Sequence, residues 1–146
     1  MLKKIKKNLI KKIFISATEQ SGDNLGRDII IKLKKINPKI IIDGIGGSKM
    51  KPFMNKQIYN LSDFKSIGIF EIIFSIKKYI QMINYLSKYI LNKSYDLVIT
   101  IDSPDFNYPL AKKIKKGGFK GKLFQVVAPT VWAWRENRAK NFALIY

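Results

Sequence analysis

Short, almost wholly apolar segments alternate with longer segments of helical periodicity along this 146-residue chain. Strands that are apolar at every position are typical of a parallel sheet, because such a sheet is buried on both faces. Segments with apolar residues every three or four positions supply the helices that cover those faces. The pattern predicts an α/β fold, specifically a Rossmann-like, doubly wound parallel sheet.

The expected elements begin at residue 12. Strands are predicted at residues 12–16, 40–42, 58–61, 97–101 and 123–127, and helices at about 21–36, 69–91 and 107–116. We therefore expect a basic leader at residues 1–11 and one Rossmann-like domain at residues 12–146. A doubly wound domain that stopped at residue 146 would be incomplete, because the last residues have the pattern of a new element.

Cationic side chains dominate the charge: 28 Lys and Arg outnumber 10 Asp and Glu, which gives a formal net charge of +18. Such an excess suits an anionic membrane surface, a negatively charged substrate or a nucleic acid. Composition explains part of it, because nearly all the cations are Lys and Ile is the commonest apolar residue, as in AT-rich genomes. Nucleic acid is the weaker candidate, since no platform of stacking aromatic side chains accompanies the scattered lysines.

The absence of Cys and His excludes several kinds of chemistry. A disulfide framework, a thiolate zinc site, a cysteine nucleophile and a Ser-His-Asp triad are impossible. Acid–base catalysis must come from carboxylates, Lys or Tyr. No apolar run approaches the roughly 20 residues of a membrane-spanning helix. Lys11 and Lys12 interrupt the basic start before a signal-peptide core forms, so a cytoplasmic location is expected.

Ligands of an open parallel sheet bind beyond the carboxyl ends of its strands. Four loops should occupy that edge, at residues 17–23, 44–47, 102–107 and 128–135. Four of the ten carboxylates lie in these loops: Glu19, Asp23, Asp102 and Asp105. This concentration of polar residues predicts the binding site without reference to any motif.

Asp102 is the strongest candidate for a chemical role. It follows the largely apolar run at residues 97–101, so we expect it to be partly buried, where an unpaired carboxylate is costly. Burial favours the protonated form of a carboxylate, which suits a general base, and Pro104 restricts the turn that follows. Asp102 and Asp105 are also potential ligands of a divalent cation, but two carboxylates separated by Ser-Pro are a weak metal signal, and no metal site is predicted.

The other loop residues have structural interpretations beside the functional ones. Ser21 and Asp23 are equally suited to capping the first helix. Gly46-Gly47 is typical of a tight turn where the backbone passes close to a ligand or a neighbouring loop, and it lacks the spacing of a dinucleotide-binding motif. Asp105 is expected to be the N-terminal cap of the following helix.

Both tryptophans and one of the three arginines fall in the last loop, and a second arginine follows three residues after it. Trp132 and Trp134 suit a core position beneath the loop. Arg135 and Arg138 stand out because the chain otherwise uses Lys, and they suggest that the planar guanidinium holds a phosphate or a carboxylate.

In these same loops the sequence resembles lipid-A-disaccharide synthases, the glycosyltransferases that join two acylated glucosamines in lipid A synthesis. The matching segments, in order, are Glu19-Gln20-Ser21-Gly22-Asp23, Gly44-Ile45-Gly46-Gly47 with Met50, Ile67-Gly68-Ile69-Phe70-Glu71, Ile101-Asp102-Ser103-Pro104-Asp105-Phe106-Asn107, and Pro129-Thr130-Val131-Trp132-Ala133-Trp134-Arg135 with Arg138. Two positions depart from the family pattern: Thr18 replaces a usual Gly and Gln20 a usual Ala.

The resemblance implies the N-terminal half of a GT-B glycosyltransferase, in which a second, C-terminal domain binds the UDP-sugar donor. The implied reaction transfers 2,3-diacylglucosamine from UDP to the 6-hydroxyl of 2,3-diacylglucosamine 1-phosphate with inversion and without a cofactor. Asp102 matches the family's proposed general base. The implied substrate-binding residues are Glu19, Ser21, Asp23, Gly46, Gly47, Asp105, Asn107, Trp132, Arg135 and Arg138. Since the donor-binding half is absent, we expect this chain alone to be inactive.

The long helix carries the predicted membrane contact. A stripe of five isoleucines is expected to cover the sheet: Ile69, Ile73, Ile76, Ile80 and Ile83. Phe70 and Phe74 project from a second side, with Lys77 and Lys78 one turn later. Exposed aromatics rimmed by Lys are typical of an interfacial contact, so we expect a peripheral location on the inner membrane, although another element covering the phenylalanines would explain the same pattern.

A second hypothesis comes from a different functional class. The chain would be a cationic Rossmann-like module that binds an anionic surface or a nucleic acid without catalysis. If charge alone governed binding, affinity would fall steeply with salt, whatever acyl chains the ligand carried.

Overall fold

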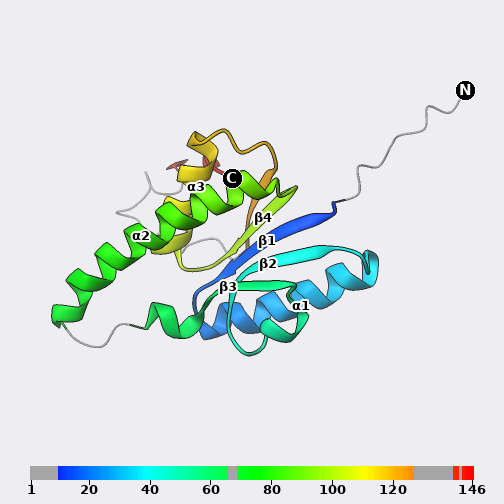
Figure 1. The fold of residues 1–146 in the computed structure, drawn as a ribbon, viewed down its shortest axis with the longest axis horizontal. Helices are drawn as coiled ribbons and strands as arrows, with labels where there is room; N and C mark the ends of the chain where they lie inside the picture. The colour runs from blue at the N-terminus through cyan, green and yellow to red at the C-terminus, as the bar shows by residue number, and fades with distance from the viewer. Residues whose placement is uncertain (1–9, 66–68, 127–139, 142) are drawn as a thin grey trace, which may run out of the picture.

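Five parallel strands form one sheet with helices on both faces, which confirms the predicted α/β class (Figure 1). The computed structural model describes residues 10–65, 69–126, 140–141 and 143–146. Its elements in chain order are β1 (Lys12–Ala17), α1 (Gln20–Ile36), β2 (Ile41–Gly46), η1 (Lys51–Phe53), β3 (Lys56–Asn60), η2 (Leu61–Phe64), α2 (Ile69–Lys93), β4 (Leu97–Ile101), α3 (Pro104–Lys116) and β5 (Lys122–Val126).

The strands lie in the order β3-β2-β1-β4-β5. The chain leaves β1 toward β2 and β3, then crosses back through α2 to place β4 on the other side of β1. This is the strand order of Rossmann-type sheets. The order reverses between β1 and β4, so a crevice is expected where the loops after these two strands diverge.

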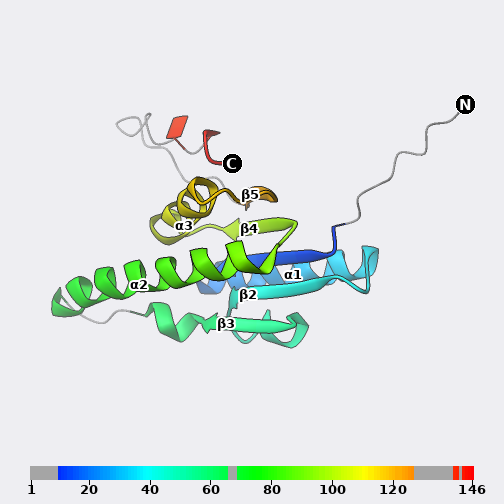
Figure 2. The same ribbon diagram turned by 45° about the horizontal axis from the view of Figure 1, so that its top comes forward.

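Among the described helices, α1 covers one face of the sheet, and α2 and α3 cover the other (Figure 2). The core between α1 and the sheet contains Ile13, Ile15, Ala17, Ile30, Ile42, Met50, Ile99 and Ile101. The core beneath α2 and α3 contains Phe14, Met82, Ile83, Leu86, Ile90, Val98, Phe106, Leu110 and Ile114. Both faces are buried, which explains why the central strands are apolar at nearly every position.

The strand β2 extends to Gly46, so the expectation of a loop at residues 44–47 is wrong for its first three residues. At Gly44 a Cβ atom would lie 1.8 Å from the carbonyl oxygen of Ile15 on β1. Only glycine leaves room for the two backbones to pair at this point. The glycine that looked like a turn signal therefore belongs to the strand.

The isoleucine stripe of the long helix covers the sheet only in part. Ile83 is 9% exposed, but Ile76 and Ile80 are 57% and 54% exposed, so the prediction is wrong for these two. The reason is the position of α2, whose first turns extend past the carboxyl ends of the strands (Figures 1 and 2). Its second half, with Met82, Leu86 and other buried residues, packs on the sheet.

Candidate active site

The loops that follow β1 and β4 meet at the point where the strand order reverses. Ser103 is the second residue after β4, and its hydroxyl donates a hydrogen bond to Oε1 of Glu19, the residue directly before α1, over 3.0 Å. Glu19 is exposed and is the N-cap residue of α1, but its side chain makes no capping hydrogen bond. The structure therefore brings Glu19 and the Asp102–Ser103 turn together, although 83 residues separate Glu19 from Asp102 in the sequence.

Asp102 opens a turn of unusual backbone conformation. Its φ angle is 49° and that of Ser103 is 46°, so two successive non-glycine residues are left-handed. Each such residue costs about 1–3 kcal/mol unless its surroundings hold it in place. The Asp102 side chain is partly buried, as predicted for a carboxylate at the end of an apolar strand. Residues with such strained backbone conformations cluster at functional sites.

The helix α3 begins at Pro104, three residues earlier than predicted. Proline fits the first helical position because the missing N–H would have no partner there. The cap residue is Ser103, so the prediction that Asp105 caps this helix is wrong. Asp105 lies instead in the first turn, where its negative charge is favourable at the positive end of the helix dipole.

Asn107 is fully buried, and its amide is bonded to three groups. Its Nδ2 donates to the carbonyl oxygens of Ile101 and Asp102, over 3.1 and 2.9 Å. Its Oδ1 accepts from the Ser16 hydroxyl over 2.7 Å. The side chain is thus directed at the backbone of the Asp102 turn.

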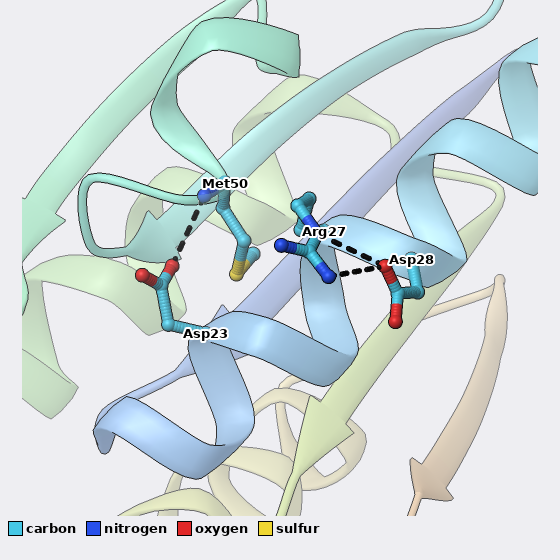
Figure 3. Close-up of polar contacts among 4 residues, drawn as sticks. All are labelled: Asp23, Arg27, Asp28 and Met50. Carbon is cyan, nitrogen blue, oxygen red and sulfur yellow. Dashed lines mark hydrogen bonds and ion pairs between the residues drawn. The ribbon is translucent and has the colours of Figure 1, made fainter.

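Asp23 is also fully buried, and it does not cap α1. Its Oδ1 accepts from the backbone N–H of Gly47 over 2.6 Å and from that of Met50 over 3.1 Å, the latter drawn in Figure 3. Its Oδ2 accepts from the backbone N–H of Lys49 over 3.0 Å. A carboxylate from α1 therefore binds the loop after β2 through three charge-assisted hydrogen bonds. This contact shapes the second loop of the predicted site.

The two glycines of that loop make the close approach possible. A Cβ atom at Gly47 would lie 2.5 Å from Oδ2 of Asp23, and one at Gly46 would lie 2.7 Å from the sulfur of Met50. The structure thus shows the close passage of the Gly46-Gly47 backbone against neighbouring groups of the protein.

Several predicted residues lie outside the described part of the chain. Trp132, Trp134, Arg135 and Arg138 belong to residues 127–139, which the structure does not describe. Phe70 and Phe74 belong to α2, but their side chains are not described. Ser21 is exposed in the first turn of α1, and Lys77 and Lys78 are exposed on α2, with Lys78 Nζ donating to the Asp63 carbonyl over 2.6 Å.

An aromatic cluster from α2, α3 and η2 lies beside the loops. The Tyr79 ring contacts those of Phe64 and Phe106, with centroids 5.7 and 5.5 Å apart. Burial, and to a lesser degree the charge of Glu19, raise the pKa of Tyr79 above its ordinary value. The Tyr79 hydroxyl donates to the Phe64 carbonyl over 3.1 Å, and the raised pKa keeps its phenol protonated at neutral pH.

Residues 10–65, 69–126 and the described C-terminal positions contain no group of three or more Asp or Glu placed to hold a metal ion. Within the same part of the chain, no helix is both long enough and apolar enough to cross a bilayer.

Sequence reasoning missed four polar residues that support this site: Ser16, Thr100, Ser103 and Gln125. Thr100 and Ser16 are fully buried in otherwise apolar strands. A polar residue in an apolar strand must find a hydrogen-bond partner, and that signal was present in the sequence.

The fold and the loops together define a Rossmann-like α/β domain with its candidate site at the strand reversal. Residues 13–146 match the lipid-A-disaccharide synthetase family. The chain belongs to this family, which confirms the resemblance drawn from its motifs and supports the enzyme hypothesis over the non-catalytic one.

The similar curated proteins are lipid-A-disaccharide synthases. That of Rickettsia prowazekii is 40% identical over 138 residues, which cover 94% of this chain and 36% of that protein. That of Chlamydia caviae is 36% identical over 127 residues, which cover 87% of this chain and 20% of that protein. The chain thus spans between a fifth and just over a third of the length of these relatives.

A solved structure agrees on the fold. The C-terminal domain of a hydrogenase from Pyrococcus furiosus aligns with a TM-score of 0.58 and 10% sequence identity, covering 81% of this chain and 92% of that domain. At this identity the likeness concerns the fold alone.

Proposed function

We propose that this chain forms the acceptor-side domain of a lipid-A-disaccharide synthase, an inverting glycosyltransferase of GT-B arrangement. The observation that carries the proposal is the position of Asp102 at the carboxyl end of β4, in a strained turn at the strand reversal. Membership of the family supports the reaction. A second domain, outside residues 13–146, would bind the UDP-sugar.

In the proposed reaction, the Asp102 carboxylate takes the proton of the 6-hydroxyl of 2,3-diacylglucosamine 1-phosphate. That oxygen forms a bond to the anomeric carbon of UDP-2,3-diacylglucosamine while the bond from this carbon to the UDP oxygen breaks. UDP leaves with the electron pair, and the configuration at the anomeric carbon inverts. Each bond change is thus accounted for by one carboxylate and the two substrates, without a cofactor.

The remaining predicted residues divide by exposure into two proposed roles. Glu19, Ser21 and Asp105 are exposed around the crevice and are proposed to bind the hydroxyl groups of the acceptor. Asp23 and Asn107 are fully buried, so we propose that they shape the site. For Gly46 and Gly47 the proposed contact is through the backbone. Trp132 is proposed to contact the sugar or its acyl chains, and Arg135 and Arg138 the phosphate groups.

The direct test is an assay of disaccharide and UDP formation from the two lipid substrates. We expect product from this chain when it is fused to the remaining part of a relative such as the Rickettsia prowazekii synthase. Residues 1–146 alone should give no product, because they would lack the donor site. No product from a folded fusion would contradict the proposed function, and product from residues 1–146 alone would contradict the division between two domains.

We also propose that the first half of α2 binds the inner membrane peripherally. Ile76 and Ile80 are one helical turn apart and more than half exposed, and Lys77 and Lys78 lie beside them. An exposed apolar face rimmed by Lys suits the boundary between acyl chains and anionic headgroups. Because this half of α2 extends past the carboxyl edge of the sheet (Figure 2), it would dock on the same side as the crevice that receives the acylated substrates.

The double substitution of Ile76→Ser and Ile80→Ser should weaken co-sedimentation with anionic phospholipid vesicles by about tenfold or more, since two large apolar side chains would no longer enter the bilayer. A second pair, Phe70→Ser with Phe74→Ser, tests the predicted aromatic contact. The matched control is Ile36→Ser, because Ile36 is 78% exposed at the far end of α1. Unchanged binding of both double variants, or an equal loss in the control, would contradict membrane docking through α2.

A further inference from the structure

Three polar residues form a row across the sheet, each one position before the last residue of its strand. Two of them are fully buried and the third, on β5, is partly buried. Ser16 on β1 pairs in register with Thr100 on β4, which pairs with Gln125 on β5. All three side chains lie on the face covered by α2 and α3, because each is two positions along its strand from a residue of that core: Phe14, Val98 or Leu123. A polar row in an otherwise apolar core needs an explanation other than packing.

Two side-chain amides at this row point at the same carbonyl group. The Asp102 carbonyl oxygen accepts from Asn107 Nδ2 over 2.9 Å and from Gln125 Nε2 over 3.3 Å. The amides come from different elements, α3 and β5. The two amides therefore hold the carbonyl group of Asp102, whose backbone is left-handed, from two directions.

Each amide is oriented by a hydroxyl group from a neighbouring strand. The Ser16 hydroxyl donates to Oδ1 of Asn107, and the Thr100 hydroxyl donates to Oε1 of Gln125. With its oxygen occupied by a hydroxyl donor, each amide has its NH₂ group left for the carbonyls of the turn. Both hydroxyls are fully buried, so water does not compete for these bonds.

We infer that Ser16, Thr100, Gln125 and Asn107 form an amide clamp that holds the Asp102–Ser103 turn in its left-handed conformation and thereby positions the Asp102 carboxylate. The catalytic part of this inference rests on the proposed function. Asn107 and Gln125 act through the backbone of Asp102 and are positioning residues. The Ser103–Glu19 hydrogen bond then links the clamped turn to the loop after β1.

The clamp is tested first on the structure of the turn. In the unmodified chain, positive φ angles should give strong intraresidue NOEs between the amide proton and Hα of Asp102 and Ser103. Gln125→Glu keeps the shape and the acceptor for Thr100 but removes the donor to the Asp102 carbonyl, and Gln125→Leu removes both. We expect both variants to weaken these NOEs. Gln57→Leu is the matched control, because Gln57 Nε2 donates to the Gly46 carbonyl at another strand end over 2.7 Å.

Unchanged NOEs at both residues in a folded Gln125→Glu chain would overturn the clamp, as would an equal loss in the Gln57→Leu control. If Gln125→Leu does not fold, the isosteric Gln125→Glu variant still decides the question.

The second test uses the fusion enzyme. Gln125→Glu should lower kcat by about 10- to 100-fold, the effect of a reacting group displaced by about 1 Å, and should change KM by less than about threefold. Weakened NOEs with an unchanged kcat would overturn the positioning role. The proposed function has its own test: an Asp102→Asn enzyme that keeps its rate would contradict it. That result would not affect the NOE evidence for the clamp.

Discussion

The Asp102→Asn fusion enzyme is expected to lose about 10²- to 10⁴-fold in turnover, because the amide cannot accept the proton of the attacking hydroxyl. The substitution is nearly isosteric. Asparagine also tolerates the left-handed conformation that Asp102 adopts at φ 49°, so the turn should persist. The measurement is the initial rate of UDP release with both lipid substrates, together with the circular dichroism spectrum of each variant.

The control for this experiment is Asp28→Asn. Asp28 is exposed on α1, where it forms an ion pair with Arg27 at 2.8 Å, and it takes no part in the proposed site (Figure 3). This variant should keep the rate of the parent enzyme. Asp102→Ala is less informative, because alanine at a positive φ angle would strain the turn and mix a structural effect with the chemical one. A near-parental rate for Asp102→Asn would disprove its assignment as general base.

The second large effect is expected on stability, from Asp23→Ala. This variant leaves the N–H groups of Gly47, Lys49 and Met50 without their carboxylate acceptor, two of them in fully buried bonds. An unpaired buried donor costs about 1–3 kcal/mol, so the free energy of unfolding should fall by about 3–5 kcal/mol. That is a large share of the roughly 5–15 kcal/mol that stabilises a typical domain. Urea denaturation followed by circular dichroism measures the difference.

Two comparisons separate this effect from a general loss of an acidic residue. Asp23→Asn keeps an oxygen for Gly47 and Met50 but places an NH₂ group against the Lys49 N–H, so its loss should be smaller, about 1–2 kcal/mol. Asp28→Ala removes an exposed carboxylate five residues further along α1 and should change the free energy by less than about 1 kcal/mol. An Asp23→Ala variant as stable as Asp28→Ala would show that the loop after β2 is held by other contacts.

The positions of the strands could be predicted because burial on both faces leaves a direct record in the sequence. The apolar runs at β1 and β4 predicted strands within one residue of their observed bounds. The end of β2 could not be predicted in the same way. Gly44 and Gly46 have the composition of a turn. Only the tertiary structure shows why this strand needs glycine: the β1 backbone lies against Gly44 and the Met50 side chain against Gly46.

The first half of α2, which extends past the sheet, shows a second feature that residue spacing cannot predict. The isoleucine spacing correctly indicates a helix with an apolar stripe. The spacing does not reveal where the sheet ends beneath the helix. It therefore predicts core positions for Ile76 and Ile80, whereas both side chains are more than half exposed. Periodicity defines a face of a helix, whereas the length of the neighbouring strands decides how much of that face is covered.

The sequence by itself determined the fold class, and it predicted the edge of the sheet proposed to carry the site and Asp102 as the proposed general base. These follow from local chemistry: apolar runs, loop composition and a carboxylate at a strand end. Only the tertiary structure decided which polar groups meet. Asp23 binds a loop 24 to 27 residues away, and Asn107 and Gln125 converge on the Asp102 carbonyl from two elements. Such partners are set by the parallel register of β1, β4 and β5, which a linear pattern does not contain.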